Sequence, residues 1–331
     1  MKRQYTGILI RLFLSVALLV LLFAIIDRDA LFKALAAVNP VIYGVGLLSF
    51  LGAVSFWTLR WHLFIRASGE QVSYLRAYAT MLTGFFYSMF LPTFVGNDVG
   101  RMVELGRDSN NKKTNVVSTV LLDRLVGLIS LALMALLALV IGSDFNSDSI
   151  TVTVVGVLAA LVAGWLIFFN RRFMEWVFGI LFRLPVINRL ESTVREVYEA
   201  LYLLHNQPRL LLITGTISLL NAVTETLAVV FVAKALGVDV NPIYFFLIMP
   251  VVWIVMLIPI SISGLGLREG AFVFFLGQLG VSSGDAVAIS LLFYSYSVVV
   301  GVLGGLLLVL NSLKAYSRRT VIATEVKGDS L

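Results

Sequence analysis

The sequence contains no cysteine and only two histidines, His62 and His205. The lack of cysteine excludes disulfides, thiolate metal sites and cysteine nucleophiles, and two histidines argue against a multi-histidine metal site. Charged residues are also scarce, at 13% of the chain against roughly a quarter in soluble domains. No phosphate-binding P-loop motif occurs, which argues against a nucleotide-driven motor. We therefore expect no cofactor and no metal.

Hydrophobic residues are abundant instead: they make up 59% of the 331 residues, and the mean hydropathy is +0.96. A single water-soluble core of this length has no room for so many apolar side chains, so lipid must surround most of them. The net charge of +6 resembles that of a nucleic-acid-binding protein. In a membrane chain it more often reports lysine and arginine retained on the cytoplasmic face. We predict an all-α polytopic protein of the cytoplasmic (inner) membrane, with no nucleic-acid partner.

Six apolar runs are long enough to cross the hydrocarbon core, which takes about 20 helical residues. They cover residues 7–26, 41–64, 116–141, 150–170, 210–235 and 285–310. Two further apolar stretches, 74–94 and 242–279, are interrupted by proline and glycine.

Basic residues decide whether the interrupted stretches cross. If 74–94 crossed, the basic segments 101–113 and 171–209 would be external and the acidic loop 142–149 cytoplasmic, against the positive-inside rule. If 74–94 enters from the cytoplasm and returns, these basic segments fall inside. We therefore predict six crossing helices plus two re-entrant broken-helix hairpins, with both termini cytoplasmic. The transmembrane domain covers 1–313, and 314–331 form a short cytoplasmic tail.

The polar segment 171–206 has apolar residues at three- and four-residue steps from Val186 to Leu204. This period predicts a cytoplasmic amphipathic linker helix, and a plain solvated connector is the alternative. Tryptophans near the ends of predicted segments are expected to be interfacial anchors; they are Trp57, Trp61, Trp165 and Trp176.

The two interrupted stretches resemble each other. Pro92 is followed nine residues later by Arg101, and Pro259 is followed nine residues later by Arg268. A turn rich in small residues or glycine lies between proline and arginine in both, and an acid follows each arginine. Because one hairpin opens inward and the other outward in the predicted topology, the match indicates an inverted-topology repeat, as in secondary transporters.

Helix breaks and arginine side chains together favour the binding of an anion. Proline ends a helix, and the amide N–H groups that begin the next half-helix attract negative charge. Arginine adds a planar, permanently charged fork for phosphate oxygens. We expect a polar cavity that binds an anionic phospholipid or a polyprenyl-phosphate-linked glycan. The candidate residues are Gly96, Asn97, Asp98, Arg101, Gly264, Gly266, Arg268 and Glu269.

Several alternatives remain at this point. The alternative to an anion site is that Arg101 and Arg268 are interfacial side chains paired with nearby acids such as Asp98, Glu104 or Glu269. Three further charged residues lie within predicted crossings: Asp123, Arg124 and Glu225. The adjacent Asp123 and Arg124 face different directions and should bind different partners. Glu225 is either a proton-coupling group or, as we favour, forms interhelical hydrogen bonds together with Asn221.

Three sequence blocks carry a family resemblance: Gly-Asn-Asp-Val-Gly-Arg at 96–101, Leu-Asp-Arg-Leu-Val-Gly at 122–127 and Gly-Leu-Gly-Leu-Arg-Glu at 264–269. In this order they resemble the transmembrane region of lysylphosphatidylglycerol synthase, the flippase-like domain family, over residues 8–313. The resemblance implies translocation of a lipid or lipid-linked saccharide. Full-length synthases add a cytosolic aminoacyltransferase domain, which these 331 residues lack. We therefore expect a translocator and not an enzyme. The alternatives are a membrane-embedded enzyme acting on a lipid phosphate, or a non-transporting partner of a glycosyltransferase or synthase.

Overall fold

The computed structural model describes residues 35–90, 96–106, 113–141, 156, 159–160, 162–183, 191–256 and 264–328. Every regular element in these ranges is a helix, as the sequence predicts. The helices are α3 (Pro40–Ala67), α4 (Tyr74–Phe90), α5 (Gly96–Gly106), α6 (Lys113–Ile141), α8 (Arg171–Leu181), α9 (Glu191–His205), α10 (Pro208–Ala235), α11 (Pro242–Met256), α12 (Leu267–Gly277) and α13 (Ser283–Gly328).

Four of these helices are long and apolar enough to cross a membrane: α3, α6, α10 and the first 28 residues of α13. At 1.5 Å per residue, 28 residues span about 42 Å, more than the ~30 Å hydrocarbon core. Large apolar side chains on their outer faces are more than half exposed, which suits a lipid surround; examples are Leu48, Ile141, Leu212 and Leu306. Four of the six predicted crossings therefore correspond to helices of a multi-pass membrane protein. The predicted crossing 7–26 and the loop 142–149 lie outside the described residues, and 150–170 is described only in part.

The first interrupted stretch forms α4 and is followed by α5, and the second forms α11 and α12. These helices contain 17, 11, 15 and 11 residues, or about 16–26 Å each, too short to span the core alone. The members of each pair pack against each other. A Cβ atom at Gly84 would lie 2.9 Å from the backbone oxygen of Asn97, so glycine allows the close approach of α4 and α5. The turns 91–95 and 257–263 lie outside the described residues.

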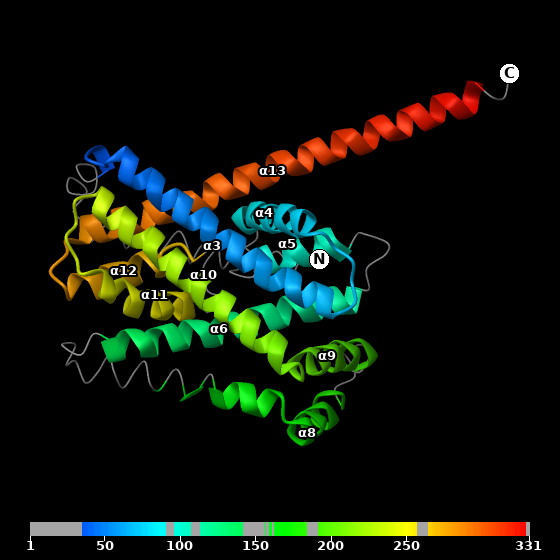
Figure 1. Ribbon diagram of the computed structural model, residues 1–331, viewed down its shortest axis with the longest axis horizontal. Coiled ribbons are helices and arrows are strands. Elements are labelled where there is room, and N and C mark those ends of the chain that lie inside the picture. Colours follow the sequence, from blue (N-terminus) through cyan, green and yellow to red (C-terminus); the bar gives the residue numbers. More distant parts are fainter. Residues whose placement is uncertain are drawn as a thin grey trace.

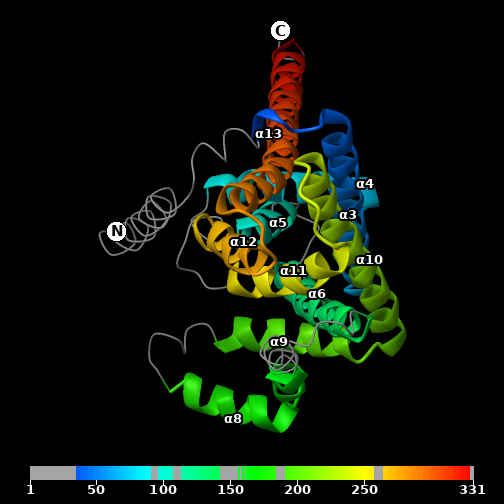
Figure 2. The same cartoon turned by 90° about the vertical axis from the view of Figure 1, so that its left-hand side faces the viewer.

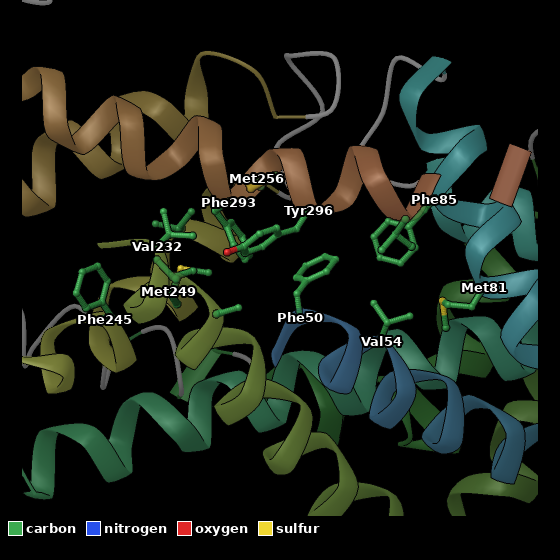
Figure 3. Packing of buried hydrophobic residues seen from close by; sticks show 14 of the residues in the cluster. Phe50, Val54, Met81, Phe85, Val232, Phe245, Met249, Met256, Phe293 and Tyr296 are labelled. Carbon is green, nitrogen blue, oxygen red and sulfur yellow. The ribbon is translucent and has the colours of Figure 1, made fainter. Parts of the chain in front are cut away.

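The helices pack around an aromatic core. Helices α3 and α10 lie side by side, and α13 runs past α4 (Figure 1). Phe50 of α3, Phe85 of α4, and Phe293 and Tyr296 of α13 meet in this core (Figure 3), with ring centroids 5.7–6.1 Å apart around Phe50. Helix α13 continues beyond residue 310 to Gly328, so the predicted tail 314–331 begins within a helix.

The segment 171–206 contains two helices rather than the single predicted one. Helices α8 and α9 form a layer at one end of the bundle (Figure 2). The apolar face of α9 packs on α6, where Leu201 and Leu204 are buried with Leu122. The apolar period of this helix thus reflects burial against protein. Helix α8, at the start of the segment, differs in that it exposes a large apolar side chain, since Trp176 is 62% exposed.

Candidate functional site

A cavity lies among the helices, and residues of eight helices, α3 to α6 and α10 to α13, line it. The space between its walls, its open side included, is about 1310 Å³. Charged side chains inside a bundle of apolar helices are expensive and are by default functional. Those that line this cavity come from five helices; they are Arg60, Asp98, Arg101, Asp123, Arg124, Glu225 and Arg268.

Asp123 of α6 is the centre of the first charged cluster, and its side chain is fully buried. Its carboxylate accepts hydrogen bonds from Nε of Arg60 at 2.6 Å and Nη1 of Arg101 at 3.0 Å. The indole Nε1 of Trp57 donates a third at 2.8 Å. Three donors therefore compensate for the water that this buried carboxylate lacks.

Arg101 of α5 continues this cluster. Its guanidinium lies 5.2 Å from the ring centre of Trp57 and 4.8 Å from that of Trp61, a favourable cation–π arrangement. It also donates to Asp98, and Asp98 accepts from Arg124 as well. Helices α3, α5 and α6 are thus joined by a chain of alternating charges, Arg60–Asp123–Arg101–Asp98–Arg124.

Two polar atoms of α5 have no hydrogen-bond partner in the described part of the chain. They are Nε of Arg101 and Oδ1 of Asn97, both buried, on residues that line the cavity. A buried donor or acceptor without a partner costs about 1–3 kcal/mol. Such groups are explained by a bound water or ligand, so α5 offers a ligand one donor and one acceptor.

Arg268 of α12, which also lines the cavity, is the centre of a second cluster. It pairs with Glu269, and its Nε donates to Oγ of Ser290 at 2.9 Å. Its guanidinium lies 4.4 Å from the ring centre of Tyr294. Oε2 of Glu269 accepts the backbone N–H of Gly266 at 2.6 Å, so the anion at the start of α12 is a side chain of the protein itself.

Seven of the eleven predicted site residues line the cavity: Asn97, Asp98, Arg101, Asp123, Arg124, Glu225 and Arg268. The other four, Gly96, Gly264, Gly266 and Glu269, do not line it. Both predicted arginines are buried, Arg101 at 0% and Arg268 at 3% exposure. They pair with Asp98 and Glu269, as the alternative interpretation expects, but their burial does not fit interfacial side chains. Asp123 and Arg124 bind different partners, as predicted.

Of the two residues predicted to form interhelical hydrogen bonds, Asn221 does so, whereas Glu225 forms none with a described residue. Nδ2 of Asn221 donates to the backbone oxygen of Ala53 on α3 at 2.9 Å. Glu225 lines the cavity, and its carboxyl makes no hydrogen bond or ion pair with another described residue.

Sequence reasoning missed or misassigned four residues of this site. Arg60 lies within a predicted crossing, and an arginine inside an apolar helix is itself a signal of function. Ser218 accepts a hydrogen bond from Nη1 of Arg60, and no sequence pattern distinguishes it. Trp57 and Trp61 were predicted to be interfacial anchors, but Trp57 binds Asp123 and Trp61 is fully buried.

Among the described residues, no three histidine, aspartate or glutamate side chains come together to hold a metal ion.

Comparison with known proteins identifies the family. Residues 8–305 match the family described as the lysylphosphatidylglycerol synthase TM region. The chain belongs to this family. This match confirms the predicted resemblance. All charged residues of the cavity wall lie within the part that matches the lysylphosphatidylglycerol synthase TM region. A protein of Methanothermobacter thermautotrophicus described as a UPF0104 membrane protein is 22% identical over 294 residues, covering 83% of this chain and 86% of that protein.

Proposed function

We propose that this protein is a secondary translocator that moves an anionic lipid or a lipid-linked saccharide across the cytoplasmic membrane. One observation carries the proposal: Arg101 and Arg268, from two separate broken-helix pairs, line the same cavity. Two guanidinium groups on the wall of one cavity suit a head group with several anionic oxygens. The membrane-protein family of the chain supports the same class of function.

Apolar and charged surfaces lie close together, as a lipid requires. The cavity wall also carries apolar and aromatic side chains, among them Leu131, Val252 and Phe272. A phospholipid has a charged head and apolar tails, and a site for it must offer both surfaces. Helices with exposed leucine and valine on their outer faces then give the tails a path through lipid.

The head group must compete with carboxylates that already hold the arginines. Arg124 is the most accessible arginine of the first cluster: its side chain is 24% exposed, and it pairs with Asp98. An incoming phosphate offers oxygens of the same charge and geometry as a carboxylate. The anion therefore enters by exchange for Asp98 at Arg124 and does not require an uncompensated buried charge at any stage.

The topology is part of the proposal. Six crossings and two re-entrant hairpins place the basic segments on the cytoplasmic side, with both termini there. The short lengths of α4, α5, α11 and α12 support hairpins that enter the membrane and return. The two hairpins then enter from opposite sides and meet at the cavity, the arrangement that alternating access needs.

Purified protein in liposomes tests this function against its alternatives. The vesicles contain phosphatidylcholine and phosphatidylglycerol with a trace of fluorescent phosphatidylglycerol or of a fluorescent polyprenyl phosphate. Movement of either probe between leaflets without chemical change supports a translocator. A changed head group supports a membrane-embedded enzyme, and neither movement nor change favours a non-transporting partner of a glycosyltransferase or synthase.

A further inference from the structure

Glu225 differs from the other carboxyl groups near the cavity. Asp98, Asp123 and Glu269 are each held by at least one arginine. Glu225 lines the same cavity, within the candidate span α10, and is not hydrogen-bonded or ion-paired to any described residue. Its neighbours on α10 are already engaged: Ser218 with Arg60 and Asn221 with Ala53.

The groups that face the cavity with Glu225 come from every helix around it. Charged ones are Arg60 on α3, Asp98 and Arg101 on α5, Asp123 and Arg124 on α6, and Arg268 on α12. Within the described chain, α4 and α11 contribute no charged residue to the wall, and α13 contributes the phenol of Tyr294.

The charges of this site do not balance without Glu225. Four arginines line the cavity, at positions 60, 101, 124 and 268. Three carboxylates pair with them, at positions 98, 123 and 269. Among the described residues of the site one positive charge is then left over, and net charge in a low-dielectric site is costly. An ionised Glu225 would balance these charges in the empty cavity. A bound lipid anion supplies the same charge, after which an ionised Glu225 would be one negative charge too many.

We propose that Glu225 takes up one proton from cavity water when an anionic head group binds, and releases it when the head group leaves. The proton and a singly charged lipid anion then cross together, so that the step moves no net charge. This inference rests on the proposed translocator function and names its coupling ion. It assigns Glu225 the role of a proton carrier rather than of a phosphate ligand.

The test uses proteoliposomes of phosphatidylcholine and phosphatidylglycerol with fluorescent phosphatidylglycerol and a trapped pH-sensitive dye. A pH gradient is imposed in either direction, and both lipid redistribution and internal pH are followed. For one-to-one coupling, we expect the fluorescent lipid to leave the acidic side, with a bias of up to about tenfold per pH unit. Proton movement should accompany it in the same vesicles.

Two variants separate Glu225 from other carboxylates. Glu225→Gln should still move lipid but without any response to the gradient. The matched control is Glu199→Gln, on the exposed surface of α9, where Glu199 pairs with Arg171; it should respond like the wild type. Folding of each variant is checked by its melting temperature.

The possible failures are distinct. If the wild type moves lipid at a rate and in a direction that do not depend on the pH gradient, proton coupling is contradicted but the translocator function is not. A gradient response that persists in Glu225→Gln contradicts the role of Glu225. No lipid movement by the wild type in any gradient contradicts both the translocator function and the proton step that rests on it.

Discussion

Arg101 and Asp123 form an ion pair of 3.0 Å in which neither side chain is exposed to solvent. The two residues lie on different helices, α5 and α6, 22 positions apart in the sequence. Asp123 also binds Arg60 of α3, so a single carboxylate joins three helices at the cavity wall. Helix α5 therefore cannot move away from α6 without breaking the ion pair between Arg101 and Asp123.

Asp123→Asn tests the importance of this carboxylate for stability. The substitution leaves Arg60 and Arg101 without the shared counter-charge, and breaking a buried ion pair costs about 3–5 kcal/mol. We expect a marked fall in the melting temperature of the protein in detergent. Asp239→Asn is the matched control because Asp239 is exposed, and it should change stability by no more than about 0.5 kcal/mol. Equal melting temperatures for both variants would contradict a structural role for the charge chain.

Gly304→Ala tests the close packing of α13 on α4. A Cβ atom at Gly304 would lie 2.0 Å from the backbone oxygen of Leu82, so one helix must shift. Overpacking of this kind costs about 1–3 kcal/mol, and we expect less folded protein and a lower melting temperature. Gly52→Ala on α3 meets no atom within 4 Å and should be neutral or slightly stabilising. If Gly304→Ala were as stable as Gly52→Ala, this helix contact would be wrong.

Gly264→Val and Gly266→Val should be more damaging than Gly179→Val, although each adds the same side chain. Gly264 and Gly266 have φ of +75° and +84°, where a β-branched residue costs about 1–3 kcal/mol. A Cβ atom at Gly264 would also meet Cε of Met256 at 2.4 Å, whereas Gly179 has open space.

Lipid movement and melting temperature must both be measured for these variants, because misfolding alone would also abolish movement. Normal movement by both hairpin variants would reduce the break before α12 to a structural kink.

Reporter fusions test the proposed topology. The positive-inside rule places Ser109 and the segment 171–206 in the cytoplasm and the loop 142–149 outside. Fusions at Ser109 and within 171–206 should therefore give a cytoplasmic signal, and fusions within 142–149 an external one. An external signal at Ser109 would mean that 74–94 crosses the membrane, and the inverted repeat would have to be abandoned.

The sequence predicts the helices better than the contacts between them. Length and hydropathy locate the long helices because lipid imposes a minimum apolar span, and proline and glycine locate both broken stretches. The alternating charge chain is not predictable in the same way. Asp123 meets Arg101 through helix packing across 22 positions, which no local period encodes. The position of Glu269 at the start of α12 has a local signal, since an acid three residues after a cap position is typical of a helix start.

The apolar period of α9 illustrates a different ambiguity. Leu201 and Leu204 recur at helical spacing, which is the same for a face on lipid and a face on protein. Only packing shows that α6 covers this face. Trp57 was misinterpreted for a similar reason, since an indole suits an interface and a buried hydrogen bond equally well.

The most direct test of the central claim is the rate of fluorescent phosphatidylglycerol movement in proteoliposomes with Arg101 or Arg268 replaced. We expect Arg101→Ala and Arg268→Ala each to slow movement by about tenfold or more, the loss of at least one charge-assisted hydrogen bond. Lysine at either position should restore movement only in part, because a point charge does not reproduce the guanidinium fork. Arg209→Ala, at the exposed start of α10, should move lipid at the wild-type rate. Wild-type rates in folded Arg101→Ala and Arg268→Ala protein would contradict an anion site between the two broken-helix pairs.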